Sequence, residues 1–535
     1  MVSKMSLPGG VPSAGVSGQT PCSDLRRSLD TKFRTAALCG LFGLVAYASA
    51  RSLVYAGMKP LSNDEVLTQA VCHQATIRGI WKALSQGVDG QPPLFYVIER
   101  STAWLIPNEH IGYRLLPMLG FVCTVILLYV FVKARNGAAC ALVCASLLLL
   151  TPLFTVFAAE ARPYTLLTAS IAMAMVCYQR AGAAPWVSGL FFSLLLATSL
   201  HYFAVFALFP FFVAELMVVF DTKKARVWVW LALLAPLASL TMYWPLLMRM
   251  NHHWWGAIYT HVSSRTLAWT YAWFMGVLPA WSAALVGAAI VAMLVGIFPM
   301  ASHPGDPKGF PKASAPERVL ILGLIILPML GYAATKITHA PFLDRYFLPT
   351  ILGITAAAGY VLGLAKPKSI TVATMFVTFA IGVQEFGFWT SPRHWVVPAA
   401  QVSSLASLAA AAHHEDLPIV VSDPAEYVVY WHYASPVLRR RIMGLADPAT
   451  AMSYTGTGVR DELLAALRLY EPIAVQYWSP FAEGHPVFLL YGAPSDWWPG
   501  RLAHDGYRLQ LLAANGGEAM YLVESKATAP IVTNQ

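Results

Sequence analysis

The sequence has 535 residues, of which 57% are hydrophobic and only 12% are charged. Soluble domains carry about 25% charged residues, so this composition excludes an ordinary soluble protein. The formal net charge of +9 is spread over short connections between apolar runs, which indicates membrane orientation and not nucleic-acid binding. Because many of these runs reach about 18 residues or more, they predict a polytopic α-helical membrane protein.

The chain begins with a segment that is not expected to fold. Residues 1–32 are rich in Gly, Pro and Ser, which predicts a disordered cytoplasmic tail. No cleavable signal peptide is visible, because the first apolar run is long and no small-residue cleavage site follows it. Residues 33–389 are predicted to form the transmembrane domain, in which 267–300 is long enough to be bent or broken. About eleven spans are expected, at 33–56, 110–132, 137–158, 164–179, 186–200, 203–220, 227–248, 267–300, 319–336, 346–365 and 369–389.

Basic clusters fall in alternate connections between these spans. Because Lys and Arg favour cytoplasmic loops, this pattern predicts a multi-pass protein of the cytoplasmic (inner) membrane with a cytoplasmic N-terminus. The opposite, outer face then holds residues 57–109, the first outer loop, and the whole C-terminal region. Residues 91–106 could form a further span, but Glu99 and Arg100 near their middle favour a helix that lies on the membrane surface.

Residues 390–535 show short apolar runs bounded by turn formers, which predict buried strands. The predicted strands lie in "LPIVVSDP", "RRRIMGLADP", "EPIAVQYW" and "VFLLYG". Helical stretches such as "VSSLASLAAAAHH" and "RDELLAALRLY" alternate with them. This alternation predicts an extracytoplasmic α/β domain with a largely parallel sheet. No glycine fingerprint for phosphate binding follows a strand, so we expect a structural or acceptor-binding role for this domain.

Polar side chains from five outer loops converge at one membrane surface in this topology. A carboxylate beside several cations suits the removal of a proton from an acceptor while an anionic leaving group is stabilised. Arginine binds phosphate through a two-pronged donor, and lysine acts as a point charge. The candidate residues are Asp64, Glu65, Glu160, Arg162, Tyr164, His201, Tyr202, His252, His253, Lys336, Arg345 and Tyr346.

Several candidates also have a plainer interpretation. The pair Asp64 and Glu65 could belong to a helix N-cap, in which Asn63 or Asp64 accepts backbone amides. His252 and His253 could be solvated loop residues, and the arginines could anchor helix ends at the lipid surface. The competing class of function is a transporter or lipid flippase, although such proteins tend to place ionisable residues near the bilayer midplane.

Five short motifs occur in order between residues 33 and 365, namely "NDE", "QPPLFY", "RLLPMLGF", "EARPY" and "DRYFLP". In this order they resemble the GT-C-fold glycosyltransferases, most closely the bacterial branch related to protein O-mannosyltransferases and the aminoarabinose transferase of lipid A modification. One departure is Gln91, where the family usually has a basic residue or histidine before the Pro-Pro pair. That departure weakens the case for a metal or phosphate contact at this position.

The resemblance implies an inverting sugar transfer from a polyprenyl-phosphate donor to an acceptor lipid, glycan or protein on the outer face. Asp64 is then expected to be the catalytic base, with Glu65 and Glu160 as further catalytic carboxylates. The donor phosphate is expected to contact Arg162, Arg345, Tyr346, Lys336 and His201. Substrate is expected to contact Tyr164, Tyr202, His252 and His253.

No metal-binding pattern of Cys and His is present in the sequence, and only Cys72 of its seven cysteines falls on the outer face. No cofactor is required, because the protein's own cations can stabilise the leaving group, although a divalent cation is compatible with this chemistry. The expected partners are the lipid-linked sugar donor, an acceptor that the sequence does not name, and membrane lipid, with no nucleic acid.

Overall fold

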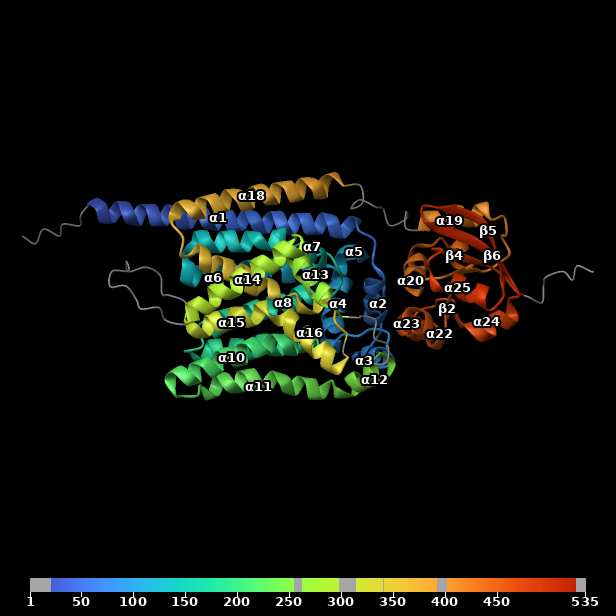
Figure 1. The fold of residues 1–535 in the computed structure, drawn as a ribbon, viewed down its shortest axis with the longest axis horizontal. Helices are drawn as coiled ribbons and strands as arrows, with labels where there is room; N and C mark the ends of the chain where they lie inside the picture. Colours follow the sequence, from blue (N-terminus) through green and yellow to red (C-terminus); the bar gives the residue numbers. More distant parts are fainter. Residues whose placement is uncertain (1–20, 255–261, 298–313, 340, 392–401, 526–535) are drawn as a thin grey trace, which may run out of the picture.

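The computed structural model describes residues 21–254, 262–297, 314–339, 341–391 and 402–525. It consists of a bundle of long helices and an α/β domain that lies at one end of the bundle (Figure 1). Short helices lie across that end, between the bundle and the α/β domain. The site described below is built where these three parts meet.

Long and mostly parallel helices form the bundle (Figure 1). Its elements are α1 (Pro21–Met58), α6 (Leu115–Leu147), η1 (Leu148–Leu150), α7 (Pro152–Phe157), α8 (Tyr164–Tyr178), α9 (Ala184–Leu200), α10 (Ala204–Thr222), α11 (Val227–Met242), α13 (Ser264–Met275), α14 (Pro279–Ile297), α15 (Ala315–Ile325), α16 (Leu327–Thr338), η2 (Asp344–Phe347), α17 (Thr350–Leu362) and α18 (Pro367–Thr390).

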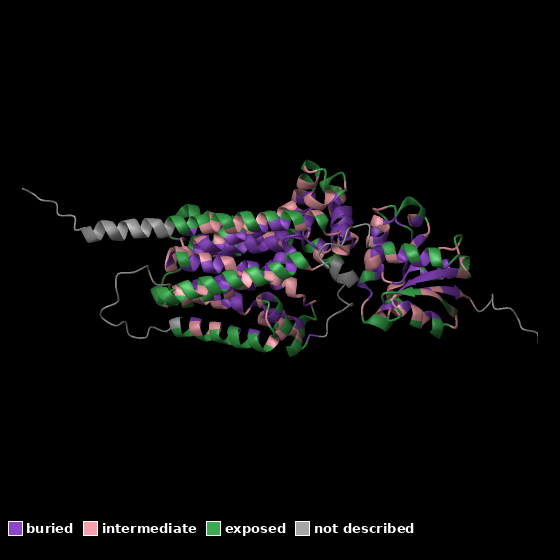
Figure 2. Cartoon of the chain, turned by 90° about the horizontal axis from the view of Figure 1, so that it is seen from above, coloured by how far each residue is buried: buried purple, intermediate pink, exposed green. Residues whose placement is uncertain are grey.

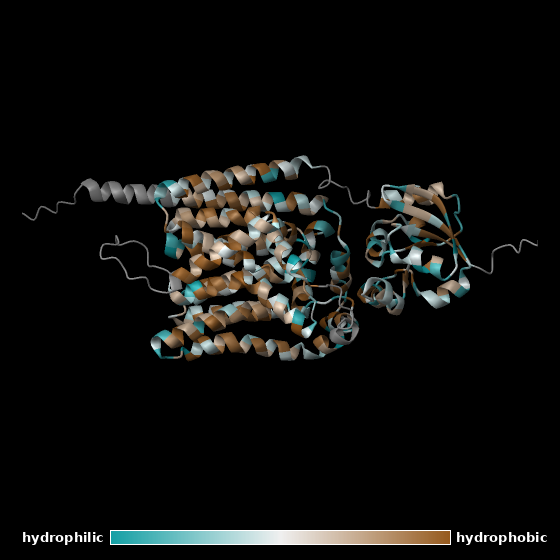
Figure 3. Cartoon of the chain, in the orientation of Figure 1, coloured by the Kyte–Doolittle hydropathy of each residue, from teal (hydrophilic) through white to brown (hydrophobic). Residues whose placement is uncertain are grey.

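The outer surface of the bundle is apolar, as a helix bundle in lipid requires. Along α18 the side chains of Phe376, Phe379 and Phe386 are exposed. Figure 2 shows buried residues gathered in the interior of the bundle, and Figure 3 shows that hydrophobic residues predominate along its helices. Exposed apolar surface of this extent is typical of membrane contact. Four described helices are long and apolar enough to cross a membrane, or up to six if two bent pairs each form one span, and four shorter apolar helices accompany them. The chain is a multi-pass membrane protein, and the number of eleven spans stays a prediction.

Two breaks in the bundle explain how long apolar stretches are divided. At Gly137 the backbone has φ +81°, which divides α6 between the spans expected at 110–132 and 137–158; the second of these continues into η1 and α7. The expected break within 267–300 is confirmed, because α13 and α14 meet at an angle of 80°; residues 298–300 lie outside the described ranges. Of the tail expected over 1–32, residues 1–20 lie outside the described ranges, and α1 begins at Pro21; the disordered tail stays a prediction.

The first outer loop folds into short helices, none of which is long enough to cross about 30 Å of hydrocarbon. They are α2 (Asn63–Cys72), α3 (Ile77–Ser85), α4 (Pro93–Leu105) and α5 (Glu109–Gly112), and α12 (Trp244–Trp254) packs against α3. In α4, Glu99 is buried, whereas Arg100 is exposed and donates to the Gln74 carbonyl at 2.7 Å. Trp104 and Leu105 near the end of this helix are also exposed, and its position on the membrane surface stays a prediction.

The C-terminal domain contains a six-stranded sheet with the order β3-β2-β1-β4-β6-β5. Its strands are β1 (Ile419–Val421), β2 (Ile442–Ala446), β3 (Val475–Tyr477), β4 (Val487–Gly492), β5 (Arg508–Asn515) and β6 (Glu518–Glu524). The first four are parallel and coincide with the four predicted strands, whereas β5 and β6 form an antiparallel hairpin that was not predicted. The helices are α19 (Ser403–Ala411), α20 (Pro424–Tyr433), α21 (Pro436–Arg439), α22 (Pro448–Thr455), α23 (Val459–Leu467), α24 (Trp478–Gly484) and α25 (Trp497–His504).

The α/β domain docks on the short helices through α20, which packs against α2. The Leu61 amide donates to the Tyr433 hydroxyl at 2.7 Å, and His432 lies 3.4 Å from Glu109. Buried residues of α2, α3 and α4 also share one apolar cluster with α20 and α23. The domain is therefore packed directly onto the loop that carries the "NDE" motif.

Candidate functional site

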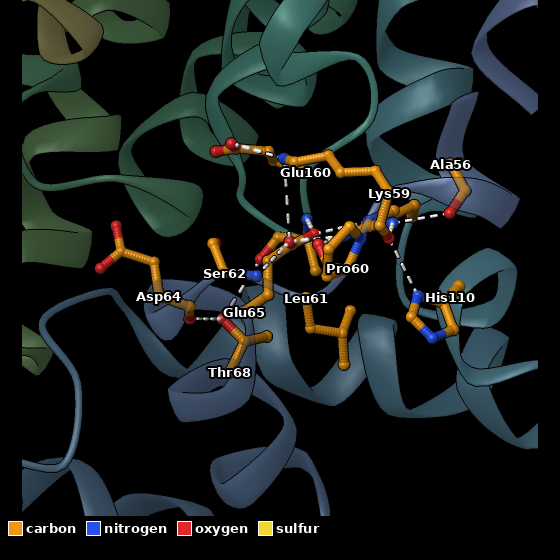
Figure 4. Close-up of polar contacts among 12 residues, drawn as sticks. Ala56, Lys59, Pro60, Leu61, Ser62, Asp64, Glu65, Thr68, His110 and Glu160 are labelled. Carbon is orange, nitrogen blue, oxygen red and sulfur yellow. Dashed lines mark hydrogen bonds and ion pairs between the residues drawn. The ribbon is translucent and has the colours of Figure 1, made fainter. Parts of the chain in front are cut away.

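Helix α2 begins at the "NDE" motif, and its first turn separates the roles of the two acids. Ser62 is the N-cap residue, and the Glu65 carboxylate accepts the Ser62 amide at 2.9 Å. The capping acid is therefore Glu65, which corrects the interpretation that Asn63 or Asp64 caps the helix. Figure 4 shows the Asp64 carboxylate turned away from the hydrogen bonds around Glu65.

Glu65 is fully buried and bound on all sides (Figure 4). Its two oxygens each lie 2.6 Å from the Arg114 guanidinium, and Oε1 also accepts the Ala161 amide at 2.8 Å. Although burial by itself would raise the pKa of Glu65, Arg114 and Lys59 lower it to about 2. Its burial leaves no room for contact with a substrate, so the structure does not place Glu65 among the carboxylates that could touch the reacting groups.

The Arg114 side chain fastens the same region from the other side. Besides Glu65, it donates to the carbonyls of Ala56, Lys59 and Pro60, at 2.6, 2.7 and 2.9 Å. Arg114 belongs to the "RLLPMLGF" motif, so two of the sequence motifs meet in this ion pair. Together they fix the end of α1, the start of α2 and the loop that follows α7.

Asp64 lies between two arginines. Its carboxylate oxygens are 3.3 Å from Nη2 of Arg162 and 3.4 Å from Nη2 of Arg345. Burial alone would raise the pKa of Asp64, but Arg162 and Arg345 outweigh it, so the pKa lies below the ordinary aspartate value. The side chain is nevertheless 31% exposed, which leaves the carboxylate accessible from the adjoining cavity.

Arg162 is held in place by a residue that the sequence analysis did not identify. Its Nη1 lies 2.6 Å from Oδ2 of the buried Asp89, and the side chain is only 3% exposed. The Nε atoms of Arg162 and Arg345 are buried and have no hydrogen-bond partner within the described ranges. Each of the two guanidiniums therefore has one donor without a partner close to Asp64. Such a pair of donors can bind an anion.

Glu160 forms the second carboxylate of this region. Its Oε1 lies 2.7 Å from the Lys59 ammonium. Burial raises the pKa of Glu160, and the carboxylates of Glu65 and Asp64 raise it further, while Lys59 only partly opposes them. Asp64 and Glu160 thus differ in proton affinity, with Asp64 the more acidic.

Aromatic rings line the cavity beside the arginines. Arg345 lies over the Tyr164 ring at 5.9 Å, and Tyr346 packs between Phe203 and His201 with ring centroids at 4.4 and 4.8 Å. The Nδ1 atom of His201 accepts the Phe203 amide at 3.1 Å, while Nε2 has no partner among the described residues. Burial, Arg345 and Arg162 lower the pKa of His201 to about 3.

With a pKa this low His201 is neutral near pH 7, and because Nδ1 accepts the Phe203 amide, Nε2 carries the proton and can donate a hydrogen bond to a phosphate. Its contact with the donor phosphate stays a prediction. Lys336 is exposed, and its ammonium lies over the ring of Tyr332 in the same helix, away from Asp64. Tyr202 is buried with its ring 6.2 Å from Tyr243 and does not line the cavity. The side chains of His252 and His253 lie outside the described residues.

A cavity of about 1120 Å³ opens beside Asp64 and extends to the α/β domain. On the membrane-domain side it is lined by Ser62, Asn63, Asp64, Leu67, Asp89, Gly90, Gln91, Glu160, Arg162, Tyr164, Leu343, Arg345 and Tyr346. On the other side it is lined by the loops that follow β1 and β4 and by α22 and α23. No group of three or more His, Cys, Asp or Glu placed to hold a metal ion occurs in the described part of the chain.

Comparison with solved structures identifies the fold. ArnT from Cupriavidus metallidurans in the apo state superposes with a TM-score of 0.55 at 12% identity, covering 91% of this chain and 98% of ArnT. The chain has the GT-C fold. ArnT bound to undecaprenyl phosphate gives a TM-score of 0.53 at 12% identity, with coverage of 90% and 97%.

A third similar structure is the arabinofuranosyltransferase AftD from Mycobacteria, with a TM-score of 0.44 at 12% identity over 90% of this chain and 40% of AftD. No family model and no curated protein matches the sequence. The similarity to ArnT confirms the GT-C resemblance at the level of the fold.

Proposed function

We propose that the chain is an inverting glycosyltransferase that moves a hexosyl or pentosyl group from a polyprenyl-phosphate donor to an acceptor hydroxyl. The observation that carries this proposal is the position of Asp64 between Arg162 and Arg345 at the wall of an open cavity. The shared GT-C fold supports it, since ArnT with this fold has been solved bound to undecaprenyl phosphate.

The reaction is a single displacement at the anomeric carbon. The acceptor oxygen forms a bond to that carbon while its proton passes to the Asp64 carboxylate. The bond between the anomeric carbon and the phosphate oxygen breaks, and the electron pair leaves with the prenyl phosphate. Attack from the side opposite the leaving group inverts the configuration.

The two arginines stabilise the charge that grows on the leaving phosphate. Both guanidiniums have a buried Nε without a partner in the described structure, so phosphate oxygens can take up these donors. No acid is needed to protonate the leaving group, because a phosphate ester anion is already a good leaving group. Tyr164 and Tyr346 line the same wall and would contact the donor, and a divalent cation is not required for any step.

The other carboxylates act around this centre. Glu65 is a positioning residue, because it bonds the amide of Ala161 next to Arg162 and thereby orients the arginine. Glu160 lines the cavity and, with its raised pKa, could hold a proton close to the acceptor. We place the site and the C-terminal domain on the outer face of the cytoplasmic membrane, as the distribution of basic loops predicts.

Identification of a co-purified lipid tests the proposal. Native mass spectrometry of the protein in lipid nanodiscs should reveal a polyprenyl-phosphate species, and added undecaprenyl phosphate should bind in a saturable manner. An Arg345→Ala variant should bind it less tightly, whereas Arg100→Ala, which changes an exposed arginine on α4, should not. Absence of saturable binding by the unaltered protein would contradict the proposed donor.

A further inference from the structure

The sheet of the α/β domain reverses its strand order between β1 and β4. Both strands are parallel and neighbouring, and the chain leaves them in opposite directions along the sheet, to β2 on one side and to the β6–β5 hairpin on the other. In open α/β sheets, ligands bind in the crevice at the carboxyl ends of the strands where such a reversal occurs. In this chain that position is formed by Ser422 and Asp423 after β1 and by Ser495 and Asp496 after β4.

This crevice belongs to the cavity that contains Asp64. All four of these residues line it, together with Trp497 of α25. At the opposite wall, Gln91 is 6% exposed, and its Oε1 has no hydrogen-bond partner in the part of the chain that the structure describes. A buried amide oxygen without a partner costs stability, so Gln91 presents an acceptor that a ligand hydroxyl or amino group can use.

Aspartates are the N-cap residues of the two helices whose N-termini face the crevice. Asp423 is the N-cap residue of α20 and accepts the Ala425 amide at 2.7 Å, while Asp496 is the N-cap residue of α25. Helix N-termini bind anions through free amides and the positive end of the helix dipole. The Asp423 carboxylate therefore occupies the N-terminus of α20. The Asp496 carboxylate makes no hydrogen bond to α25 and instead accepts the Ser422 hydroxyl and the Ala493 amide. Its negative charge still disfavours a phosphate at the N-terminus of α25.

The remaining charges also disfavour an anion. Asp423, Asp461 and Asp496 line this side of the cavity, against one cation, Arg460, which already pairs with Asp423 at 2.6 Å. Burial, followed by the charges of Asp447 and Asp423, raises the pKa of Asp461 to about 6. The lining of the crevice therefore carries net negative charge, whereas the opposite wall of the cavity presents the pair of arginines.

Its other lining groups match a sugar. Tyr454 of α22 is 45% exposed and packs with Trp497 of α25, with ring centroids 5.7 Å apart. Thr455 and Thr457 line the same cavity. A sugar ring presents C–H groups on its faces and hydroxyls at its rim, so it can stack on aromatic faces while carboxylates and hydroxyls accept its O–H groups.

We propose that this crevice binds the acceptor, and that the acceptor is a neutral or amino-bearing glycan. The inference rests on the proposed function, since it names the acceptor of that same site. The glycan would lie across the α/β domain and present a hydroxyl to Asp64, while the lipid phosphate binds at the two arginines. The cavity would thus bind the anionic donor at its arginine-lined wall and the glycan acceptor at its aspartate-lined wall.

A panel of oligosaccharides tests the proposal with the full-length protein in nanodiscs. Neutral, amino-bearing and sulfated oligosaccharides are screened by glycan array, and hits are titrated by calorimetry. We expect hits among neutral or amino-bearing probes, and Tyr454→Ala and Trp497→Ala should each weaken their binding about tenfold. Tyr477→Ala is the matched control, because Tyr477 is an exposed ring of the same domain outside the cavity.

Binding of undecaprenyl phosphate is measured on the same samples, so that a failure of the acceptor assignment can be distinguished from a failure of the proposed function. If the lipid binds but no neutral or amino-bearing oligosaccharide does, the acceptor assignment is wrong and the proposed function stands. Preference for sulfated probes, or equal binding by the cavity variants and Tyr477→Ala, would likewise overturn it. If the unaltered protein binds no undecaprenyl phosphate, the proposed function itself fails.

Discussion

Glu65 and Arg114 form a buried two-pronged ion pair in which each carboxylate oxygen lies 2.6 Å from a guanidinium nitrogen. Asp64, its neighbour in sequence, points the other way, into the cavity between Arg162 and Arg345. The adjacent acids therefore have separate tasks: one holds the loops together, and the other faces the reaction. This difference makes their substitutions behave differently.

Glu65→Gln should mainly reduce stability. The change leaves Arg114 buried without its counter-charge, and loss of one partner of a buried pair costs about 3–5 kcal/mol. The midpoint of thermal unfolding in detergent should fall clearly for Glu65→Gln. For Asp64→Asn, whose carboxylate is partly exposed, the change should stay within about 1 kcal/mol. Equal midpoints for the two variants would refute the structural role of Glu65.

The pH dependence should distinguish Asp64 from Glu160 as the base. A carboxylate base works above its pKa, and the pKa of Asp64 is lowered whereas that of Glu160 is raised. The pH profile of kcat/KM for the donor reports pKa values of the free enzyme. The midpoint of its acid limb should therefore lie below the ordinary pKa of aspartate. A midpoint above the ordinary pKa of glutamate would indicate that Glu160 is the base instead.

Binding of the donor should shift that limb. The phosphate adds negative charge and competes for both arginines, so the pKa of Asp64 should rise in the complex. The acid limb of kcat should then lie at higher pH than the limb of kcat/KM.

Glu65 has its pKa lowered to about 2, so its stabilising effect is present above the ordinary glutamate pKa and is lost as the pH falls toward 2. Unfolding midpoints measured at each pH supply the control.

Replacing Arg345 and replacing Arg162 should both weaken lipid binding, but only the loss of Arg162 should also reduce stability. Arg345→Ala should weaken binding of undecaprenyl phosphate by about ten- to a hundredfold, the loss expected for charge-assisted hydrogen bonds, with the fold retained. Arg162→Ala should weaken binding similarly and also lower the unfolding midpoint, because Asp89 then remains buried without a cation. Unchanged lipid affinity in both variants would remove them from the site.

Gly331 gives a prediction away from the cavity. A Cβ at this position in α16 would clash with the Phe347 ring, which belongs to the same short helix as Arg345. Gly331→Ala should therefore displace Arg345, lower turnover and destabilise the protein by about 1–3 kcal/mol. Gly287→Ala in α14 is the control, since its Cβ would meet no atom within 4 Å. Partial recovery in Gly331→Ala/Phe347→Leu would confirm the contact.

The sequence predicted the elements whose signals are local. Apolar runs identified the bundle, turn-bounded runs identified β1 to β4, and the ordered motifs brought Asp64, Arg162 and Arg345 to one surface. The β5–β6 hairpin was missed, although "NGG" at its turn, with Gly516 and Gly517 both at positive φ, is a local hairpin signal.

What the sequence could not predict depends on contacts between distant segments. Asp89 is an ordinary loop acid until the fold places it 2.6 Å from Arg162. Glu65 finds Arg114 in another motif, and His201 becomes neutral only because burial and two arginines surround it. The contribution of the α/β domain to the cavity follows from docking of α20 on α2, for which no local pattern exists.

Transfer by Asp64→Asn tests the central claim most directly. Asparagine keeps the size of the side chain but cannot accept the proton, so turnover from a synthetic polyprenyl-phosphate sugar should fall about a hundredfold or more. Binding of undecaprenyl phosphate and the unfolding midpoint should remain close to those of the unaltered protein, and the same assay is run on both samples. Full activity in Asp64→Asn, with donor binding intact, would contradict the assignment of Asp64 as the base.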